Sequence, residues 1–110
     1  MEPSSKAEMT AALALLWQRF LPEMLARVSI LEEAARACAE GTLIEIQIEA
    51  AHSAAHKLAG SLGSFNITRG SVLARELELL YSGGDGPDPK LGPQVTSLAA
   101  ELRTLVEAHK

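Results

Sequence analysis

The stretch LIEIQIEAAHSAAHKLAGSLGSF, residues 43–65, decides how this chain is expected to fold. Apolar side chains recur along it at helical spacing, so we expect one long helix over these residues. Its opening, residues 43–48, also alternates between apolar and polar side chains, and a short strand there is the competing interpretation. The helical pattern continues past residue 48 without a turn signal, which favours a helix throughout.

This predicted helix has two different faces when residues are placed at steps of about 100°. One face is apolar and is expected to pack into the core, with Gln47 as a polar exception. Its apolar members are Ile44, Ala51, Ala54, Leu58, Leu62 and Phe65. The opposite face surrounds His56, which is therefore expected to point into solvent. The neighbours of His56 on that face are Glu45, Glu49, His52, Ser53, Ala59, Gly60 and Gly63.

Helical patterns also fill the rest of the chain. Alanine and leucine together number 35 residues, whereas valine, isoleucine and threonine together number 14, a balance that favours helices over strands. The loop signal over residues 82–89, SGGDGPDP, is the clearest break. Five helices are expected. The first covers about residues 6–20, and the second begins at Pro22 and stops at Gly41. The third covers 43–65 and is capped by Thr42, the fourth is capped by Asn66, Thr68 or Ser71 and ends at Leu80, and the fifth covers 91–108.

These helices predict an all-α fold, an antiparallel four-helix bundle with an additional N-terminal helix. The chain has 110 residues, which suits a single domain over 1–110, with residues 1–6 expected to be flexible. Aliphatic side chains must supply most of the core, because the sequence has only four aromatic residues. We expect Trp17 and Phe20 to pack within it, and Cys38 to be a buried apolar filler.

Composition excludes several classes of function. The net charge of −4 argues against nucleic acid as a partner, which requires a basic surface. No apolar run approaches the roughly 18 residues of a membrane span, and the N-terminus does not resemble a secretion signal, so we expect a cytoplasmic protein without membrane insertion. The single cysteine, Cys38, can form neither an internal disulfide nor a cysteine-based metal site.

The surroundings of His56 suggest a chemical role. Glycine inside a helix costs about 1 kcal/mol relative to alanine, and Gly60 and Gly63 both follow His56 within two turns. That cost is explained if another surface must approach the backbone closely beside the imidazole. Near neutral pH a large fraction of exposed histidine is uncharged, with a free ring nitrogen that can attack phosphorus.

Residues 55–65, AHKLAGSLGSF, resemble the signature of histidine-containing phosphotransfer (HPt) domains. That signature has leucine two residues after the histidine and glycine four residues after it, here Leu58 and Gly60. Leu73, Leu77 and Glu78 resemble the family's following helix. The resemblance implies that His56 accepts a phosphoryl group from the aspartate of a response-regulator receiver domain and passes it to another receiver. A hybrid sensor histidine kinase is a further candidate partner.

The resemblance also implies which residues meet the phosphoryl group or the receiver: Lys57, Gly60, Gly63, His52, Ser53 and Ala59. It implies a phosphotransfer mediator rather than a conventional enzyme, with no cofactor of its own and with Mg²⁺ held by the receiver. Many members have lysine three residues after the histidine, where this chain has Ala59. Lys57 is the candidate substitute. Asn66 replaces a glycine usual near the helix end and can adopt the same left-handed backbone.

Three other interpretations stay open at this stage. His56 could be an ordinary surface histidine. His52 and His56 are four residues apart and could bind zinc with Glu45 or Glu49, although the glutamate of a His-Glu-x-x-His motif is absent because Ser53 follows His52. Finally, the chain could be a non-catalytic adaptor or dimerisation bundle that has lost the acceptor role, and the absence of lysine at position 59 is its main support.

Overall fold

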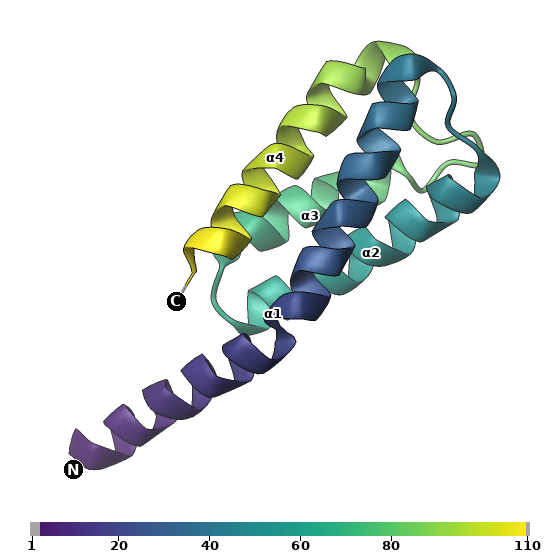
Figure 1. Cartoon of the computed structure of the whole chain (residues 1–110). Helices are drawn as coiled ribbons and strands as arrows, with labels where there is room; N and C mark the ends of the chain where they lie inside the picture. The colour runs from purple at the N-terminus through teal and green to yellow at the C-terminus, as the bar shows by residue number, and fades with distance from the viewer. Residues whose placement is uncertain (1–2, 110) are drawn as a thin grey trace.

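In the computed structural model, which describes residues 3–109, four α-helices form an antiparallel bundle (Figure 1). The helices are α1 (Pro3–Glu40), α2 (Glu45–Ser64), α3 (Thr68–Leu80) and α4 (Gly92–Ala108), and a short 3₁₀ helix, η1 (Pro89–Leu91), precedes α4. Helix α1 packs on α2 and α4, and α3 packs on the same two helices. The predicted all-α bundle is confirmed, and residues 43–48 contain no strand.

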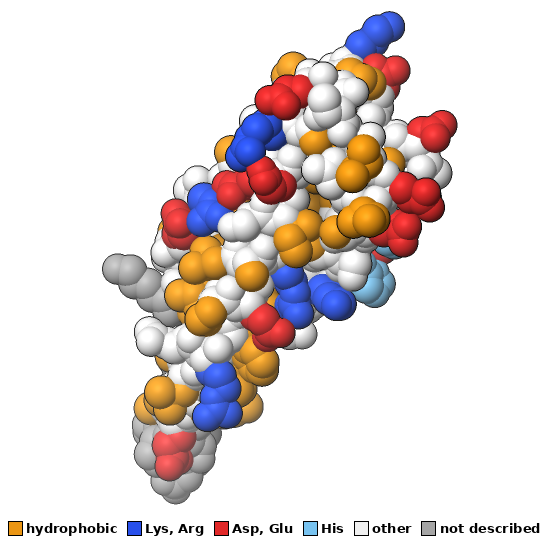
Figure 2. Space-filling view, turned by 45° about the vertical axis from the view of Figure 1, so that its right-hand side comes forward, with side chains coloured by type: hydrophobic (Ala, Val, Ile, Leu, Met, Phe, Trp, Pro, Cys, Tyr) orange, Lys and Arg blue, Asp and Glu red, His pale blue; other side chains and the backbone are white. Residues whose placement is uncertain are grey.

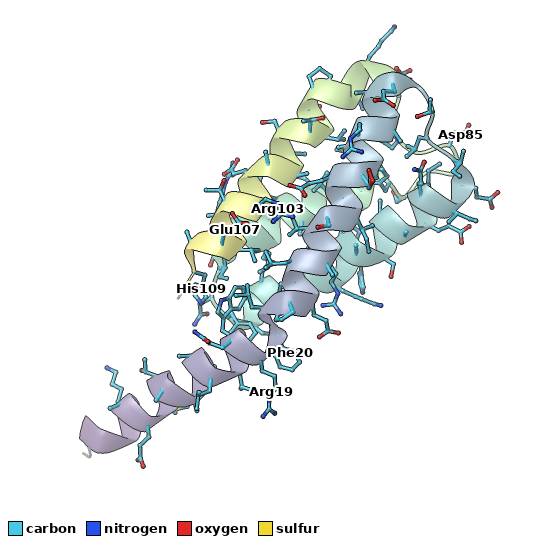
Figure 3. All side chains as sticks on the ribbon, viewed as in Figure 1. Arg19, Phe20, Asp85, Arg103, Glu107 and His109 are labelled. Atoms are coloured by element: carbon cyan, nitrogen blue, oxygen red, sulfur yellow. The ribbon has the colours of Figure 1, made fainter. Side chains whose placement is uncertain are left out.

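The expected separate N-terminal helix is wrong, because residues 3–40 form one continuous helix that contains Pro22. Proline lacks an N–H group and usually ends or kinks a helix. Here Trp17 and Met24, on either side of it, are both buried in the same core, so packing holds the two halves together. Figure 3 shows α1 changing direction near Phe20, close to the proline.

The length of α1 sets the shape of the molecule. Its 38 residues span about 57 Å at a rise of 1.5 Å per residue, which matches the longest dimension of 56 Å. The part of α1 before Trp17 therefore extends beyond the ends of the other helices (Figure 1). Residues 3–6 lie within this helix and residues 1–2 lie outside the described part, so the expected flexibility of residues 1–6 stays a prediction.

The core is built mainly from aliphatic side chains, and all four helices contribute to it. Its largest fully buried members are Trp17, Tyr81, Met24, Leu31, Leu58, Leu62, Leu73, Leu77, Leu102, Val28, Val95 and Val106. Trp17 packs edge-to-face on Phe65 and on His109, which closes one end of the bundle. Cys38 is buried as predicted. Phe20, predicted to be in the core, is 39% exposed, and Ile44, predicted to face inward, lies outside the core before the first turn of α2.

The helix starts differ in detail from the predicted caps. Gln47 Oε1 accepts a hydrogen bond from the Ile44 backbone N–H at 3.1 Å, so Gln47 caps α2 and Thr42 does not. None of the three candidate caps of α3 acts as one, because Ile67 precedes the helix without a side-chain cap. Asn66 instead has φ 61° and turns the chain between α2 and α3, which confirms its predicted left-handed backbone.

Ion pairs tie α4 to its neighbours on the outside of the bundle. Arg103 of α4 binds Glu32 of α1 through two hydrogen bonds of 2.6 and 2.8 Å. Arg69 of α3 binds Glu101 of α4 at 2.9 Å. None of the helices described within residues 3–109 is long and apolar enough to cross a membrane.

Candidate functional site

His56 lies in the middle of α2, and 67% of its side chain is exposed. The helix is anchored directly behind it, because Ala55 and Leu58 are completely buried. The imidazole therefore projects from a backbone that the core holds in place. The predicted orientation of His56, outward from a buried helix, is confirmed.

The ring of His56 is oriented by a carboxylate of the neighbouring helix. His56 Nδ1 lies 2.8 Å from Glu78 Oε2, and Glu78 belongs to α3. An ionised carboxylate can only accept a hydrogen bond, so Nδ1 carries the proton. In the neutral imidazole the other nitrogen, Nε2, then keeps its lone pair. The hydrogen bond from His56 lowers the pKa of Glu78, against the smaller opposing effect of burial.

A cation lies on the other side of the same carboxylate. Arg75 Nη1 is 3.6 Å from Glu78 Oε1, one turn earlier on α3, and its side chain is mostly exposed. Glu78 itself is only 17% exposed, so it lies beneath both partners. Figure 2 shows a histidine on the surface of the bundle with acidic and basic side chains beside it. The three residues place an imidazole, a carboxylate and a guanidinium in one row across α2 and α3.

The surface next to His56 on the C-terminal side has little bulk. A Cβ atom added at Gly60 would meet no heavy atom of the described residues within 4 Å, so this glycine faces open space. Gly63 is also exposed, but a Cβ there would lie 3.4 Å from Ser71 Oγ on α3. Gly60 thus leaves room for an approaching surface, whereas a Cβ at Gly63 would make ordinary contact with Ser71 of α3.

Ala59 is an exception to the predicted open face. Its side chain is only 2% exposed, so the expectation that it contacts a receiver or the phosphoryl group is wrong. The physical reason is its position at the edge of that face, toward α3. Ser71 of α3 packs there and donates a hydrogen bond to the Ala59 carbonyl at 2.8 Å. A helical wheel gives angles but not the side from which the next helix packs.

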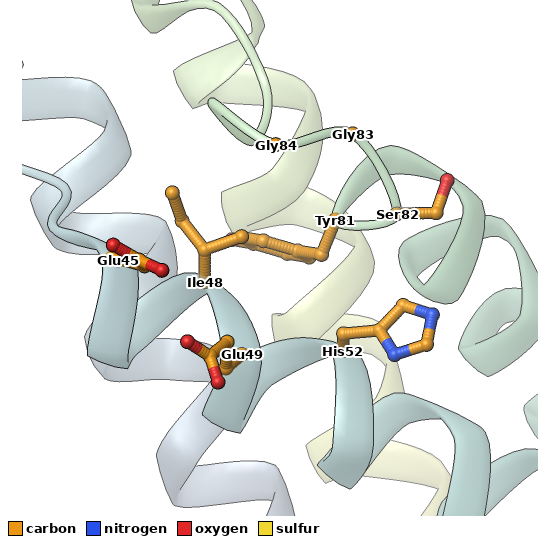
Figure 4. Close-up of a pocket in the computed structure, with 8 residues that line it drawn as sticks. All are labelled: Glu45, Ile48, Glu49, His52, Tyr81, Ser82, Gly83 and Gly84. Carbon is orange, nitrogen blue, oxygen red and sulfur yellow. The ribbon is translucent and has the colours of Figure 1, made fainter.

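The other predicted contact residues lie around His56 at varying depth. Lys57 and Ser53 are exposed. His52 is half-buried and lines an open groove of about 470 Å³ between the start of α2 and the end of α3 (Figure 4). The groove is lined by Glu45, Ile48, Glu49, His52, Tyr81, Ser82, Gly83 and Gly84. Burial raises the pKa of Tyr81, at its floor, to about 12.

The alternative zinc site is not assembled. Within the part of the chain that the structure describes, no three histidine, cysteine, aspartate or glutamate side chains come together in a way that could hold a metal ion. Nδ1 of His56 is instead engaged by Glu78.

Residues 15–109 match the family model described as "Hpt domain". The chain belongs to the Hpt domain family. Hpt domains are histidine phosphotransfer intermediates of two-component phosphorelays, and they exchange phosphoryl groups with receiver domains. The matched segment includes all of α2, α3 and α4, and begins within α1.

A curated relative carries the same region within a much longer protein. Protein RcaC of Microchaete diplosiphon is 33% identical over 99 residues, which cover 90% of this chain. The chain spans only 15% of the length of that relative, so the likeness concerns one Hpt domain and not the whole protein. No solved structure matches the chain.

Sequence reasoning missed the contact of Glu78 and Arg75 with the site, because Glu78 entered only as a match to the family's following helix and both residues are otherwise interpreted as surface charges. The register of the hairpin could have identified Glu78. Helices α2 and α3 are antiparallel around the turn at Ile67, and His56 and Glu78 are each 11 residues from it. Residues equally far from such a turn meet at the same level, so a charge at position 78 is expected beside position 56.

Proposed function

We propose that His56 is the phosphoacceptor of this Hpt domain, taking a phosphoryl group from a receiver aspartate and passing it to the aspartate of another receiver. The observation that carries the proposal is the 2.8 Å contact between His56 Nδ1 and Glu78 Oε2 on a ring that is otherwise in solvent. It holds the proton on Nδ1 and leaves Nε2 as the free, outward nucleophile.

The transfer step follows from this tautomer. The lone pair of His56 Nε2 attacks phosphorus of the acyl phosphate, an Nε2–P bond forms, and the P–O bond to the aspartate breaks, leaving the aspartate as a carboxylate. The imidazole ring gains positive charge while Nδ1 keeps its proton. Glu78 accepts the hydrogen bond from that N–H, and its negative charge favours the cationic ring. Transfer to the next receiver is the reverse of this step.

The residues around His56 also provide space for the receiver and cations near the phosphoryl group. Gly60 leaves open space for a receiver beside the imidazole. A phosphoryl group on Nε2 brings negative charge near Glu78, which requires a cation in reach. Arg75, at 3.6 Å from Glu78, and the exposed Lys57 are the candidates for that role. The divalent Mg²⁺ of the reaction belongs, in this proposal, to the receiver domain.

The decisive experiment measures phosphoryl uptake directly. The 110-residue chain is incubated with a receiver that has been charged with labelled phosphate, and the product is tested for acid-labile, base-stable label. We expect the wild-type chain to take up label and His56→Gln to take up none, with unchanged helicity and melting temperature. Label in His56→Gln would overturn the assignment of the acceptor.

His52→Gln is the matched control, because it removes the other α2 histidine one turn away. It should retain uptake, and loss of label in this variant alone would move the acceptor to His52. A wild-type chain that binds charged receivers without taking up label would support the alternative function, a non-catalytic adaptor.

A further inference from the structure

The first half of α1 exposes a concentration of large apolar side chains. Its residues before Trp17 project past the other helices of the bundle (Figure 1), and hydrophobic side chains are visible along that end of the surface in Figure 2. Five of the exposed large hydrophobic residues belong to it: Met9, Leu13, Leu15, Leu16 and Phe20. Leu13, Leu16 and Phe20 are partly covered by the bundle, at 39–45% exposed, and Leu13 lines a pocket with Phe65 and His109, whereas Met9 and Leu15 are more than 70% exposed. Because short isolated helices are marginally stable, a partner that covered these side chains would stabilise the segment.

Four of these five residues form one stripe with the spacing of a coiled coil. Met9, Leu13, Leu16 and Phe20 are separated by four, three and four residues, which is the alternation of heptad positions d and a. Continuing the same register gives Lys6 at one end and Glu23 at the other. Leu15 lies about 130° away from the centre of this stripe on the helix. The stripe thus has an apolar centre and oppositely charged ends.

We propose that the α1 stripe, defined by residues 6–23, pairs with the stripe of a second copy of this chain, antiparallel, to form a dimer. In antiparallel coiled coils an a position faces a d position. Pairing residues whose numbers add to 29 then places every heptad position opposite its proper partner: Met9 with Phe20, Leu13 with Leu16, and Lys6 with Glu23. Each pair occurs twice by the twofold symmetry.

The charges of Lys6 and Glu23 favour antiparallel over parallel pairing of the two helices. In antiparallel pairing Lys6 meets Glu23 at both ends of the stripe. A parallel pair in register would instead place Lys6 against Lys6 and Glu23 against Glu23, and like charges at facing positions oppose association. Lys6 and Glu23 are both exposed, and Glu23 is in contact only with Arg27 four residues along its own helix among the described ion pairs.

The place where α1 enters the bundle continues the stripe. A groove of about 430 Å³ lies between α1 and the end of α2, and Phe20, Glu23, Met24 and Phe65 are among its lining residues. The antiparallel register brings the start of the second copy's helix to this groove, with its Lys6 at Glu23. The apolar surface available to the second copy thus includes this groove as well as the projecting part of α1.

The test is the mass of the 110-residue chain in solution, measured by sedimentation equilibrium over a range of concentrations. We expect a monomer–dimer equilibrium. Leu13→Glu combined with Leu16→Glu should raise the dimer dissociation constant at least about 100-fold, because each dimer would bury four unpaired carboxylates. Circular dichroism checks that the bundle of the variant remains folded.

Leu15→Glu is the matched control, since it changes a leucine of the same helix that is even more exposed, 72% against 43–45% for Leu13 and Leu16. It should leave the dissociation constant unchanged. A dimer that Leu15→Glu weakens as much as the double variant would be non-specific apolar association and would overturn the proposal. A chain that stays monomeric also overturns it, including one whose α1 stripe binds another protein or a lipid vesicle instead.

Charge exchange tests the direction of pairing. Lys6→Glu and Glu23→Lys should each raise the dissociation constant about tenfold, and the double exchange should restore it. In a Cys38→Ala background, the Met9→Cys and Phe20→Cys proteins should form a disulfide with each other when they are mixed under air oxidation, and neither alone should do so. Cross-linking of Met9→Cys with itself would show parallel pairing and overturn the register. The proposal does not depend on the phosphotransfer assignment, because none of these readouts involves His56.

Discussion

Two exposed surfaces of this protein are built in opposite ways, and both are on helices. The surface around His56 is polar and sits on a part of α2 whose other side is entirely buried, with Leu58 at 0% exposure. The part of α1 before Trp17 carries exposed apolar side chains, such as Met9 and Leu15, and extends past the other helices (Figure 1). Chemistry requires atoms held in fixed positions, whereas association can itself supply the order that a free helix lacks. Exposure alone therefore does not identify a functional surface, because the packing beneath the surface decides what it can do.

The strongest prediction compares how tightly the backbone is packed beneath each of the two surfaces. Leu58→Ala removes a fully buried side chain directly under the site and should lower the free energy of unfolding by about 2–5 kcal/mol. Leu15→Ala, on the projecting half of α1, should change it by less than about 0.5 kcal/mol. Urea titration followed by circular dichroism measures both. Equal effects of the two substitutions would show that the projecting segment is as well packed as α2, and would remove the contrast.

The second effect concerns the orientation of the imidazole. Glu78→Ala should slow phosphoryl transfer about tenfold, because an exposed charge-assisted hydrogen bond contributes about 1.5 kcal/mol and solvent screening keeps it at the low end. Glu78→Gln should recover part of the rate, since its amide oxygen still accepts from Nδ1 but carries no charge. Single-turnover transfer from a charged receiver provides the measurement. An unchanged rate in Glu78→Ala would mean that Glu78 has no part in positioning His56.

The pH dependence of stability gives a check that is independent of transfer. The pKa of Glu78 is lowered below 4.5 in the folded protein, chiefly by the hydrogen bond from His56. A lowered carboxyl pKa stabilises the fold above the unfolded value, and this contribution is lost as the pH falls through the folded value. The difference in unfolding free energy between wild type and Glu78→Gln should therefore be larger at pH 7 than at pH 3. The opposite trend would contradict the direction of the shift.

The sequence correctly predicted the helical bundle and the outward direction of His56, because both follow from the period of a single helix. It did not predict the contacts between two neighbouring helices. Ala59 is buried because Ser71 of α3 packs on that side, and Glu78 reaches His56 because of the register of the hairpin. The periodicity of the α2 sequence predicts neither of these contacts.

The continuity of α1 was missed for a different reason. A proline at position 22 is a valid start signal for a helix, and the same residue is tolerated inside one when packing on both sides compensates. Burial of Trp17 and Met24 in one core decides between the two, and that information lies in tertiary contacts. Local signals therefore predicted which residues are helical better than they predicted where one helix ends.

A fourth, smaller effect tests whether a receiver docks in the space at Gly60. Gly60→Ala fills open space inside α2 and should raise the free energy of unfolding by up to about 1 kcal/mol, through the helix propensity of alanine. Gly60→Leu should leave the fold intact as well, but slow transfer from a charged receiver, since the added bulk stands where the receiver approaches. Thermal melts and transfer rates of the two variants separate folding from docking. A normal transfer rate in Gly60→Leu would show that the receiver does not use this space.

The smallest expected effect distinguishes the two cations near the phosphoryl group. Arg75 is already held by the Glu78 carboxylate that orients His56, whereas Lys57 extends from α2 about 100° around the helix from His56. Being tethered, Arg75 loses less side-chain freedom on meeting the phosphoryl group, so Arg75→Gln should reduce transfer about three- to fivefold, and Lys57→Gln less. Raising the salt concentration should shrink both differences, because exposed charges are screened. A larger loss in Lys57→Gln would place the phosphoryl contact on α2 and leave Arg75 as a partner of Glu78 alone.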